Sequence, residues 1–262
     1  MISKLQIITL IIILSLITIG YNFHSNQNTK VKSPVTIAVT KPDFNKIKDT
    51  NDKKIAFFTY LSPYIDYINH QILADRQQLI ILAKDPSKIN LNNKLIQRLS
   101  SQYKLPIPKV GIDSIWISQL LRRVNILPLS MVLAQAAMES SWGTSRFAIA
   151  GNSYFGQWCF TKGCGIVPLK PDPQNYHEVQ KFPSTQAAIQ AYFNNINTNQ
   201  AYSGLRSTRA KLQQHQQPIS AQYLVQGLNQ YSQIGHQYIR QLLELIKTNK
   251  QFIPHQNFIN DK

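Results

Sequence analysis

Residues 125–160 read NILPLSMVLAQAAMESSWGTSRFAIAGNSYFGQWCF, and this stretch decides the fold of the C-terminal half. Its first half predicts an amphipathic helix, because apolar and small residues recur three and four positions apart. One helix face carries residues that allow close packing inside a core: Leu129, Val132, Leu133, Ala136 and Ala137. A second face carries Met131, Gln135, Met138 and Trp142. Gly143 then predicts the end of the helix.

Glu139 lies beside the second face, in the last turn of this predicted helix. The C-terminus is the negative end of the helix dipole, and the apolar neighbours Met138 and Trp142 are expected to exclude water from the carboxyl group. Both effects favour the protonated form. A carboxylic acid that stays neutral near pH 7 can protonate a leaving alcohol, and a glycosidic bond is a common substrate for such a step.

The alternative for a single helix glutamate is an exposed, solvated side chain. The scarcity of acidic residues favours a functional role instead, since the stretch from Ser114 to Asn260 contains only Glu139, Asp172, Glu178 and Glu244. Glu244 is explained by Arg240 and Lys247, which flank it at helix-neighbour spacings on a polar face. Three candidates therefore remain.

Length and composition set the outer limits. The 262 residues suffice for one domain of about 150 residues plus appendages. The 28 Lys and Arg residues outnumber the 12 Asp and Glu residues, so the formal net charge is +16 and a polyanionic partner is expected. The two cysteines are too few for a disulfide framework or a four-ligand zinc site.

The N-terminus predicts the compartment. Residues 5–19 read LQIITLIIILSLITI, which is typical of a signal anchor or signal peptide over residues 1–21. We favour an uncleaved anchor, because no small-x-small cleavage site follows. A buried core helix is the alternative, but the run has no polar face. The chain is therefore expected in the cell envelope, anchored in the inner membrane and facing the periplasm, or secreted if the leader is cleaved.

Export changes the interpretation of the charge and of the cysteines. An exported basic chain is expected to meet an anionic envelope polymer rather than DNA, so we expect no nucleic-acid partner. A bond between Cys159 and Cys164 can persist in this compartment and would close a small loop. Two free buried thiols are the alternative.

The rest of the chain is divided by composition and periodicity. We predict a polar, lysine-rich tether over 22–52, an N-terminal helical part over 53–125, a catalytic domain over 126–250 and a tail over 251–262. A helical stripe begins the second part: Phe58, Leu61, Ile65, Ile68, Ile72 and Leu79. Ser62 and Pro63 are typical of a cap and a first-turn proline, so a new helix is expected to start there.

Further short helices are predicted over 92–103 and 114–124. Another stripe lies near the end of the chain: Ile234, Tyr238, Leu242 and Leu245. Helical periodicity is lost between Gly151 and Phe182, where we expect loops and a small β-hairpin. The predicted fold class is mainly α, with one small irregular lobe.

Several segments together carry a family resemblance. AQAAMESSWGTSRFAIAGNSYFGQW at 134–158, KFPSTQAAIQAYFNNIN at 181–197 and AYSGLR at 201–206 resemble the glucosaminidase family of lysozyme-like peptidoglycan hydrolases. AFFTYLSPYIDYINHQILADR at 56–76 resembles the Bax-type proteins of Gram-negative bacteria, which carry this domain. The resemblance covers roughly 54–246. It implies a lysozyme-like helical fold, cleavage of glycan strands after N-acetylglucosamine, and neither metal nor cofactor.

The resemblance also implies roles for individual residues. Glu139 matches the catalytic acid of the family. Asn152, Phe155 and Gly156 match a turn that lines the sugar cleft, with turn formation and core packing as the alternatives. Tyr192 and Tyr202 match aromatic residues that face the site, although plain packing is the usual role of a tyrosine. We expect Trp142 to help hold the glycan strand.

The second carboxylate is where this sequence departs from the family. Many relatives place it in an acidic strand of the irregular lobe, whereas this chain offers PDPQNYHEVQKF at 171–182, with Glu178 and the more distant Asp172. Glu178 is therefore the candidate second catalytic group. If no second carboxylate reaches within about 5 to 9 Å of Glu139, the usual retaining and inverting geometries fail. Assistance by the 2-acetamido group of the substrate then becomes the leading mechanism.

The sequence thus predicts a peptidoglycan hydrolase, a β-N-acetylglucosaminidase that acts by general acid catalysis. A muramidase or lytic transglycosylase on the same fold is one alternative, because one acid suffices for each. A non-catalytic peptidoglycan-binding protein is the other. A metal site of His177 with the two cysteines lacks paired ligand spacing, and the sequence does not determine the oligomeric state.

Overall fold

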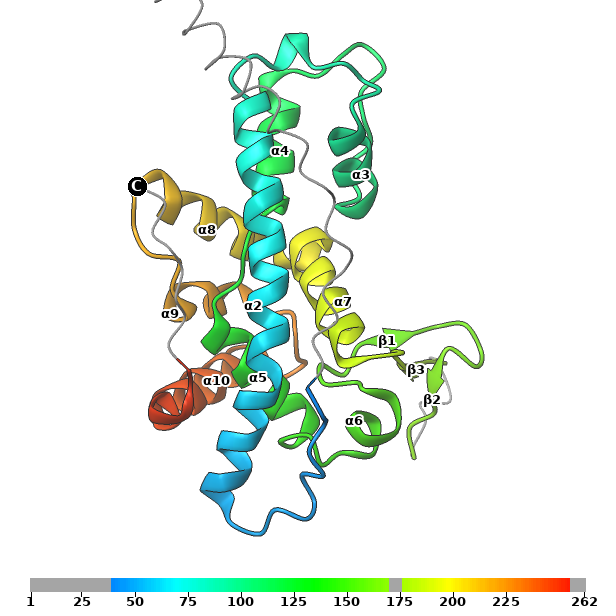
Figure 1. Cartoon of the computed structure of the whole chain (residues 1–262), viewed down its shortest axis with the longest axis vertical. Helices are drawn as coiled ribbons and strands as arrows, with labels where there is room; N and C mark the ends of the chain where they lie inside the picture. Colours follow the sequence, from blue (N-terminus) through cyan, green and yellow to red (C-terminus); the bar gives the residue numbers. More distant parts are fainter. Residues whose placement is uncertain (1–38, 170–175, 255–262) are drawn as a thin grey trace, which may run out of the picture. The chain divides into compact units, whose positions relative to one another are not determined.

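The computed structural model describes residues 39–169 and 176–254, which are mainly helical with one small antiparallel sheet (Figure 1). The predicted mainly α fold is thereby confirmed. The predicted anchor at 1–21, the tether up to residue 38, Asp172 and the tail from 255 lie outside the described residues. Within the described ranges, none of the helices combines the length and the apolar character that a membrane crossing needs.

The elements follow one another in a simple order. The α-helices are α2 (Thr50–Leu82), α3 (Lys94–Gln102), α4 (Ser114–Arg123), α5 (Leu129–Ser140), α6 (Arg146–Gly151), α7 (Thr185–Thr198), α8 (Ser203–Gln214), α9 (Ala221–Leu224) and α10 (His236–Thr248). The strands are β1 (Trp158–Cys159), β2 (Gly165–Ile166) and β3 (Glu178–Gln180). Short 3₁₀ turns lie at η1 (Pro86–Lys88), η2 (Gln200–Tyr202), η3 (Val225–Leu228) and η4 (Lys250–Phe252).

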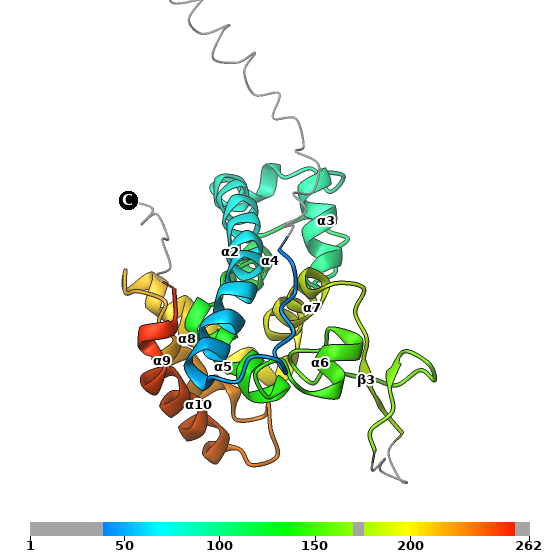
Figure 2. The same ribbon diagram turned by 60° about the horizontal axis from the view of Figure 1, so that its bottom comes forward.

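Helix α2 is the longest element and packs against α4, α5 and α7. Both ribbon views show it running past these helices (Figures 1 and 2). It begins at Asp49, whose Oδ1 accepts hydrogen bonds from the backbone N–H groups of Asn51 at 2.8 Å and Asp52 at 2.9 Å. The predicted helical stripe is buried, as expected: Phe58, Leu61, Ile65, Ile68, Ile72 and Leu79.

The prediction of a new helix start at Ser62 and Pro63 is wrong, because both residues lie inside α2. Proline removes one backbone donor from a helix. The Ser62 hydroxyl donates to the Phe58 carbonyl at 2.6 Å. Leu61 and Ile65, on either side of the proline, are fully buried. Tertiary packing on both sides therefore keeps one continuous helix.

The predicted tether also differs from the structure over residues 39–52. Phe44 is only 2% exposed, and its ring centroid lies 5.4 Å from that of Phe57. Lys41 donates from Nζ to the Ala148 carbonyl at 2.6 Å. A Cβ atom at Gly143 would lie 2.5 Å from the Phe44 ring. This segment is therefore anchored to the turn after α5, which its polar composition did not predict.

The short helices α3 and α4 confirm the predictions for 92–103 and 114–124, with boundaries that differ from the predicted ones by at most two residues. Their caps are Asn93 and Asp113, whose side chains accept from backbone N–H groups of the first turn. The predicted last stripe forms α10, except that Ile234 precedes the helix and is 48% exposed.

The irregular lobe contains a three-stranded sheet in the order β1-β3-β2 rather than a simple hairpin. Trp158 of β1 pairs with Val179, and Gly165 of β2 pairs with Gln180, both antiparallel. A disulfide joins Cys159 to Cys164, which resolves the alternatives left open by the sequence. Strand β3 lies between β1, which contains Cys159, and β2, which begins directly after Cys164.

A fully buried arginine fixes the connector that leads into α5. Arg209 of α8 donates to the carbonyls of Arg122 and Ile126, each at 2.9 Å, and to Oδ1 of Asn197 at 2.8 Å. Burial lowers its pKa to about 9, so the guanidinium group is still charged at neutral pH. Asn69 of α2 adds reciprocal bonds to the backbone of Leu127 at 2.9 and 3.1 Å. The start of α5 is thus held by side chains from α2 and α8.

We predict that Arg209→Met lowers the free energy of unfolding by about 3 kcal/mol, because several buried acceptors lose their donor. Lys211→Met, at an exposed position of the same helix, is the control and should have little effect. Chemical denaturation measures both. Equal stabilities for the two variants would contradict the role given to Arg209.

Candidate active site

Helix α5 carries Glu139 to the edge of the core. Residues 129–137 of this helix are buried except for Ser130, so Glu139 comes just after the deeply buried part. The helix ends because Ser141 and Trp142 adopt left-handed backbone angles, with φ of 52° and 58°. The Ser140 hydroxyl accepts from the Gly143 N–H at 2.9 Å, which fixes the turn that follows.

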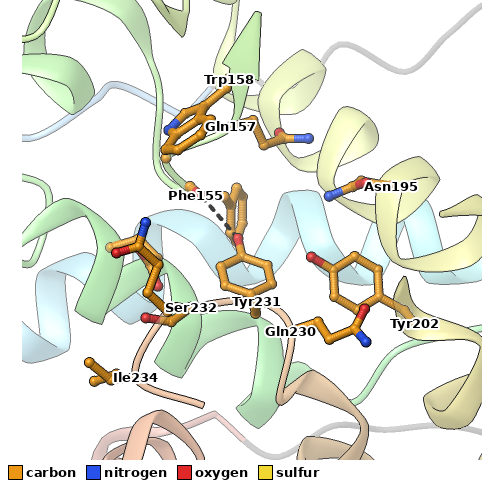
Figure 3. Close-up of a pocket in the computed structure, with 12 residues that line it drawn as sticks. Phe155, Gln157, Trp158, Asn195, Tyr202, Gln230, Tyr231, Ser232 and Ile234 are labelled. Atoms are coloured by element: carbon orange, nitrogen blue, oxygen red, sulfur yellow. Dashed lines mark hydrogen bonds between the residues drawn. The ribbon is translucent and has the colours of Figure 1, made fainter. Parts of the chain in front are cut away.

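Glu139 lines a cleft of about 920 Å³, which we name the Glu139 cleft. Its remaining walls are aromatic rings, amides and backbone: Phe155, Gly156, Gln157, Trp158, Asn195, Tyr202, Gln230, Tyr231, Ser232, Gln233 and Ile234. Figure 3 shows Trp158 and Ile234 at opposite ends, with the rings of Phe155 and Tyr231 between them. Glu139 is the only acidic residue among these lining residues, all of which belong to the described part of the chain.

The pKa of Glu139 is raised, chiefly because burial removes water from its charged form. A hydrogen bond from Tyr238 of α10 acts in the opposite direction and lowers this pKa. Burial raises the pKa of Tyr238, so its hydroxyl keeps its proton at neutral pH. Because burial is the larger of the two effects, the pKa of Glu139 moves upward, which is the direction that a general acid needs.

The Glu139 side chain is tied to a buried polar chain. The Tyr238 hydroxyl accepts from Nε2 of Gln135 at 2.9 Å, and Oε1 of Gln135 accepts from the hydroxyl of Tyr192. Gln135 lies one helical turn before Glu139 on α5 and is fully buried. Hydrogen bonds therefore link Tyr192, Gln135 and Tyr238 across α7, α5 and α10 (the polar chain), and Tyr238 in turn acts on the pKa of Glu139.

The floor of the cleft is built from stacked rings. Phe155 and Tyr192 stack with ring centroids 4.1 Å apart and an interplanar angle of 18°. The hydroxyl of Tyr231 donates to the Phe155 carbonyl at 2.9 Å, drawn as the dashed line in Figure 3. The ring of Phe155 thus packs on the ring of Tyr192, and a hydrogen bond from Tyr231 holds its backbone.

The backbone angle of Gly156 favours glycine at this position beside Glu139. Its φ of +61° lies in the left-handed region that favours glycine. A Cβ atom there would lie 3.6 Å from Oε2 of Glu139. That separation is an ordinary van der Waals contact, so the positive φ is the reason for glycine here.

The predicted site residues divide into two groups. Glu139, Phe155, Gly156 and Tyr202 line the cleft, and Tyr192 lies beneath Phe155, where it is fully buried. Asn152 and Trp142 are not among the lining residues. Asn152, with φ of 50°, caps the end of α6 and donates from Nδ2 to the Phe182 carbonyl at 3.1 Å. Its place in the structure matches the turn-forming alternative.

Trp142 packs on the other side of the helix end. Its ring centroid lies 5.8 Å from that of Phe57 and 5.2 Å from that of Phe58, both on α2. Lys54 lies over its face at 5.7 Å. The expectation that Trp142 shields Glu139 from water therefore differs from the structure, where the rings of the cleft stand beside the carboxyl group.

Glu178 also lies outside the cleft lining. Its carboxylate accepts from the backbone N–H groups of Gly163 at 2.8 Å and Gly165 at 2.6 Å, and from the hydroxyl of Tyr176. The Tyr176 bond and then the two N–H groups lower its pKa, so it is ionised at neutral pH. The structure thus engages Glu178 in holding the disulfide loop.

Among the described residues, one group of side chains places possible metal-ligand atoms close together. Cys159, Cys164 and Glu178 place one donor atom each within 4.8 Å of one another. The two sulfur atoms are bonded to each other, however, and a disulfide offers no thiolate ligand. This donor set does not fit a thiolate metal site in the oxidised protein.

Several cleft and supporting residues were not identified from the sequence: Gln157, Asn195, Tyr231 and Tyr238. Tyr238 belongs to a predicted helical stripe, and its hydroxyl group was the only available sign that this position does more than pack. Tyr231 lies in the segment between η3 and α10, where no periodicity points to a role.

Comparisons with known proteins show the family of this chain. Residues 116–251 match the family model described as glucosaminidase, mannosyl-glycoprotein endo-beta-N-acetylglucosaminidase. The match spans slightly more than half of the chain and includes every residue of the Glu139 cleft. The chain therefore belongs to the glucosaminidase family.

The similarity to one relative covers more of the chain than the family model does. The chain is 32% identical over 212 residues to Protein bax of Escherichia coli strain K12, which covers 81% of this chain and 75% of the relative. No solved structure matches the chain significantly.

We predict that Tyr238→Phe moves the alkaline limb of the pH–activity profile to higher pH. The hydrogen bond from Tyr238 lowers the pKa of Glu139, so its loss leaves burial less opposed and keeps the acid protonated further into the alkaline range. Turnover of purified cell wall as a function of pH measures the shift. Tyr223→Phe, an exposed tyrosine outside the cleft, is the control. A limb that stays in place or moves to lower pH would count against the contact.

Proposed function

We propose that this protein is a glycoside hydrolase that cleaves peptidoglycan glycan strands after N-acetylglucosamine, with Glu139 as the general acid. The observation that carries the proposal is a single partly buried carboxyl group with a raised pKa in a cleft of aromatic rings and amides. Membership of the glucosaminidase family supports the reaction class. A lysozyme-like relationship of the fold belongs to the same proposal.

The cleft chemistry favours assistance by the substrate. Among the described residues, Glu139 is the one acid on the cleft wall. In the proposed first step the carbonyl oxygen of the 2-acetamido group bonds to the anomeric carbon while the glycosidic C–O bond breaks. The proton of Glu139 goes to the departing oxygen. Water then attacks the anomeric carbon, the oxazolinium ring opens, and the released proton returns to the Glu139 carboxylate.

The walls suit an uncharged polymer that carries charged branches. Phe155, Tyr202 and Tyr231 offer apolar ring faces to sugar rings, and Gln157 and Asn195 offer amides to hydroxyl groups. The net charge of +16 favours a polymer whose stem peptides and lactyl groups carry carboxylates. The apolar run at 5–19 supports the proposed location, an inner-membrane anchor facing the periplasm or, if it is cleaved, secretion.

Glu139→Gln is expected to reduce the release of products from purified cell wall by about 10² to 10⁴, because the amide cannot donate the proton. Glu244→Gln, on an exposed face of α10, should retain activity. Mass spectrometry of the soluble products is the measurement. Full activity in the Glu139 variant would refute its assignment as the acid.

The same substitution has an expected effect on stability. Burial raises the pKa of Glu139 above its value in the unfolded chain. The folded state therefore loses stability as pH rises from the pKa of the unfolded chain to that of the folded protein. Glutamine avoids this loss. Glu139→Gln should therefore be at least as stable as the wild type at pH 8, so that lost activity reflects lost chemistry.

Substrate assistance makes a separate prediction. A substrate with an N-trifluoroacetyl group in place of the N-acetyl group has a less nucleophilic carbonyl oxygen, so its turnover should fall by roughly tenfold or more. Binding affinity should change far less. Equal turnover of the two substrates would favour attack by water without the acetamido group.

The lone acid of the described cleft also suits a lytic transglycosylase, in which one carboxyl group serves as both acid and base. The end groups distinguish the two reactions. A reducing N-acetylglucosamine end supports the proposed hydrolase, whereas a 1,6-anhydromuramic acid end supports the transglycosylase. Binding to cell wall without any soluble product would indicate a non-catalytic binding protein.

A further inference from the structure

A second pocket of about 480 Å³ adjoins the Glu139 cleft, and we name it the amide pocket. It shares three lining residues with the Glu139 cleft: Gln157, Trp158 and Asn195. Its other walls come from the end of α3, from β3 and from α7 with the residue after it: Gln102, Lys104, Gln180, Ala191, Asn194, Thr198 and Asn199. The two hollows are therefore neighbours across one common wall.

The chemistry of the amide pocket suits neutral polar ligands. Most of its side chains are uncharged amides, which can both donate and accept hydrogen bonds. Lys104 is the single ionisable residue of the lining. Sugar hydroxyl groups and acetamido groups need both donors and acceptors, which the amides supply.

Trp158 provides the aromatic face of the common wall. Its side chain is 53% exposed, although burial of an indole ring is usually favourable. The ring stacks on His177 with centroids 4.0 Å apart and an interplanar angle of 22°. Figure 3 shows Trp158 at the end of the cleft, next to Gln157. An exposed ring held in one orientation is a suitable platform for a sugar ring.

Trp158 lies in strand β1, directly before the loop that the disulfide closes. The next residue, Cys159, is bonded to Cys164. Glu178, which pairs with Cys159 across the sheet, accepts from the N–H groups of Gly163 and Gly165 at 2.8 and 2.6 Å. These contacts order the loop without using the exposed face of the indole ring.

We propose that the amide pocket is a second carbohydrate-binding site that continues the Glu139 cleft, with Trp158 as the stacking platform between them. The protein then holds a glycan strand of several sugars, because both hollows must be filled for full affinity. This inference rests on the proposed function for the identity of the ligand as a glycan. Beyond that function, the inference states where the glycan strand continues once it has passed Glu139.

The test measures binding of β-1,4-linked N-acetylglucosamine oligomers of increasing length to the full-length protein carrying Glu139→Gln. Isothermal titration calorimetry then reports affinity without turnover. We expect affinity to rise from the dimer to the longer oligomers. Trp158→Ala should lower affinity for the long oligomers by roughly tenfold, since a stacked ring contributes about this much.

A second variant blocks the amide pocket alone. Ala191 of α7 is partly exposed and lines the amide pocket but not the Glu139 cleft. Ala191→Trp should therefore remove the gain with length while leaving dimer binding intact. Phe160→Ala is the matched control, because Phe160 is a 71% exposed aromatic residue of the same disulfide loop that lines neither hollow. Trp158→Tyr should restore part of the affinity.

The outcomes separate this inference from the proposed function. Affinity that is independent of length, or that falls equally in Trp158→Ala and Phe160→Ala, overturns the second site. Product release by the wild type that depends on Glu139 would still support the hydrolase in that case. Conversely, length-dependent binding lost in Ala191→Trp supports the second site even if the wild type releases no product, which would refute only the hydrolase.

Discussion

The burial of helix α5 is the constraint on which the rest of the structure depends. Nearly every residue of this helix is covered, by α2 along one side and α10 along another. A helix in such a position can contain polar side chains only if each finds a partner. Gln135 satisfies this condition through Tyr192 and Tyr238, so the packing of three helices fixes the donors beside Glu139.

The electrostatics of the site follow from this arrangement. Burial favours the neutral form of Glu139, and one phenol hydroxyl group holds it in place without neutralising a charge. The cleft walls come from α7, from the turn at 155–158 and from the segment at 230–234, all of which meet at the end of α5. The raised pKa of Glu139 therefore depends on tertiary packing as much as on the position of this residue in the helix.

In the irregular lobe, the hydrogen bonds of a carboxylate stabilise a loop. Glu178 is a short distance along the chain from the cleft residues, yet its carboxylate is engaged by backbone N–H groups and Tyr176. With the disulfide between Cys159 and Cys164, it orders a loop that has little apolar core of its own. The same loop carries Trp158 into the wall shared by the two hollows.

The sequence by itself determined the helices with clear periodicity and the position of Glu139 at the end of an apolar helix, because these depend on neighbours within a few residues. Only the tertiary structure decided which side of the helix end faces the cleft, where Phe155 does and Trp142 does not. It also joined Gln135 to side chains 57 and 103 positions away. Local periodicity carries no information about such pairs, since a helix buried on nearly all sides has no single polar face to reveal them.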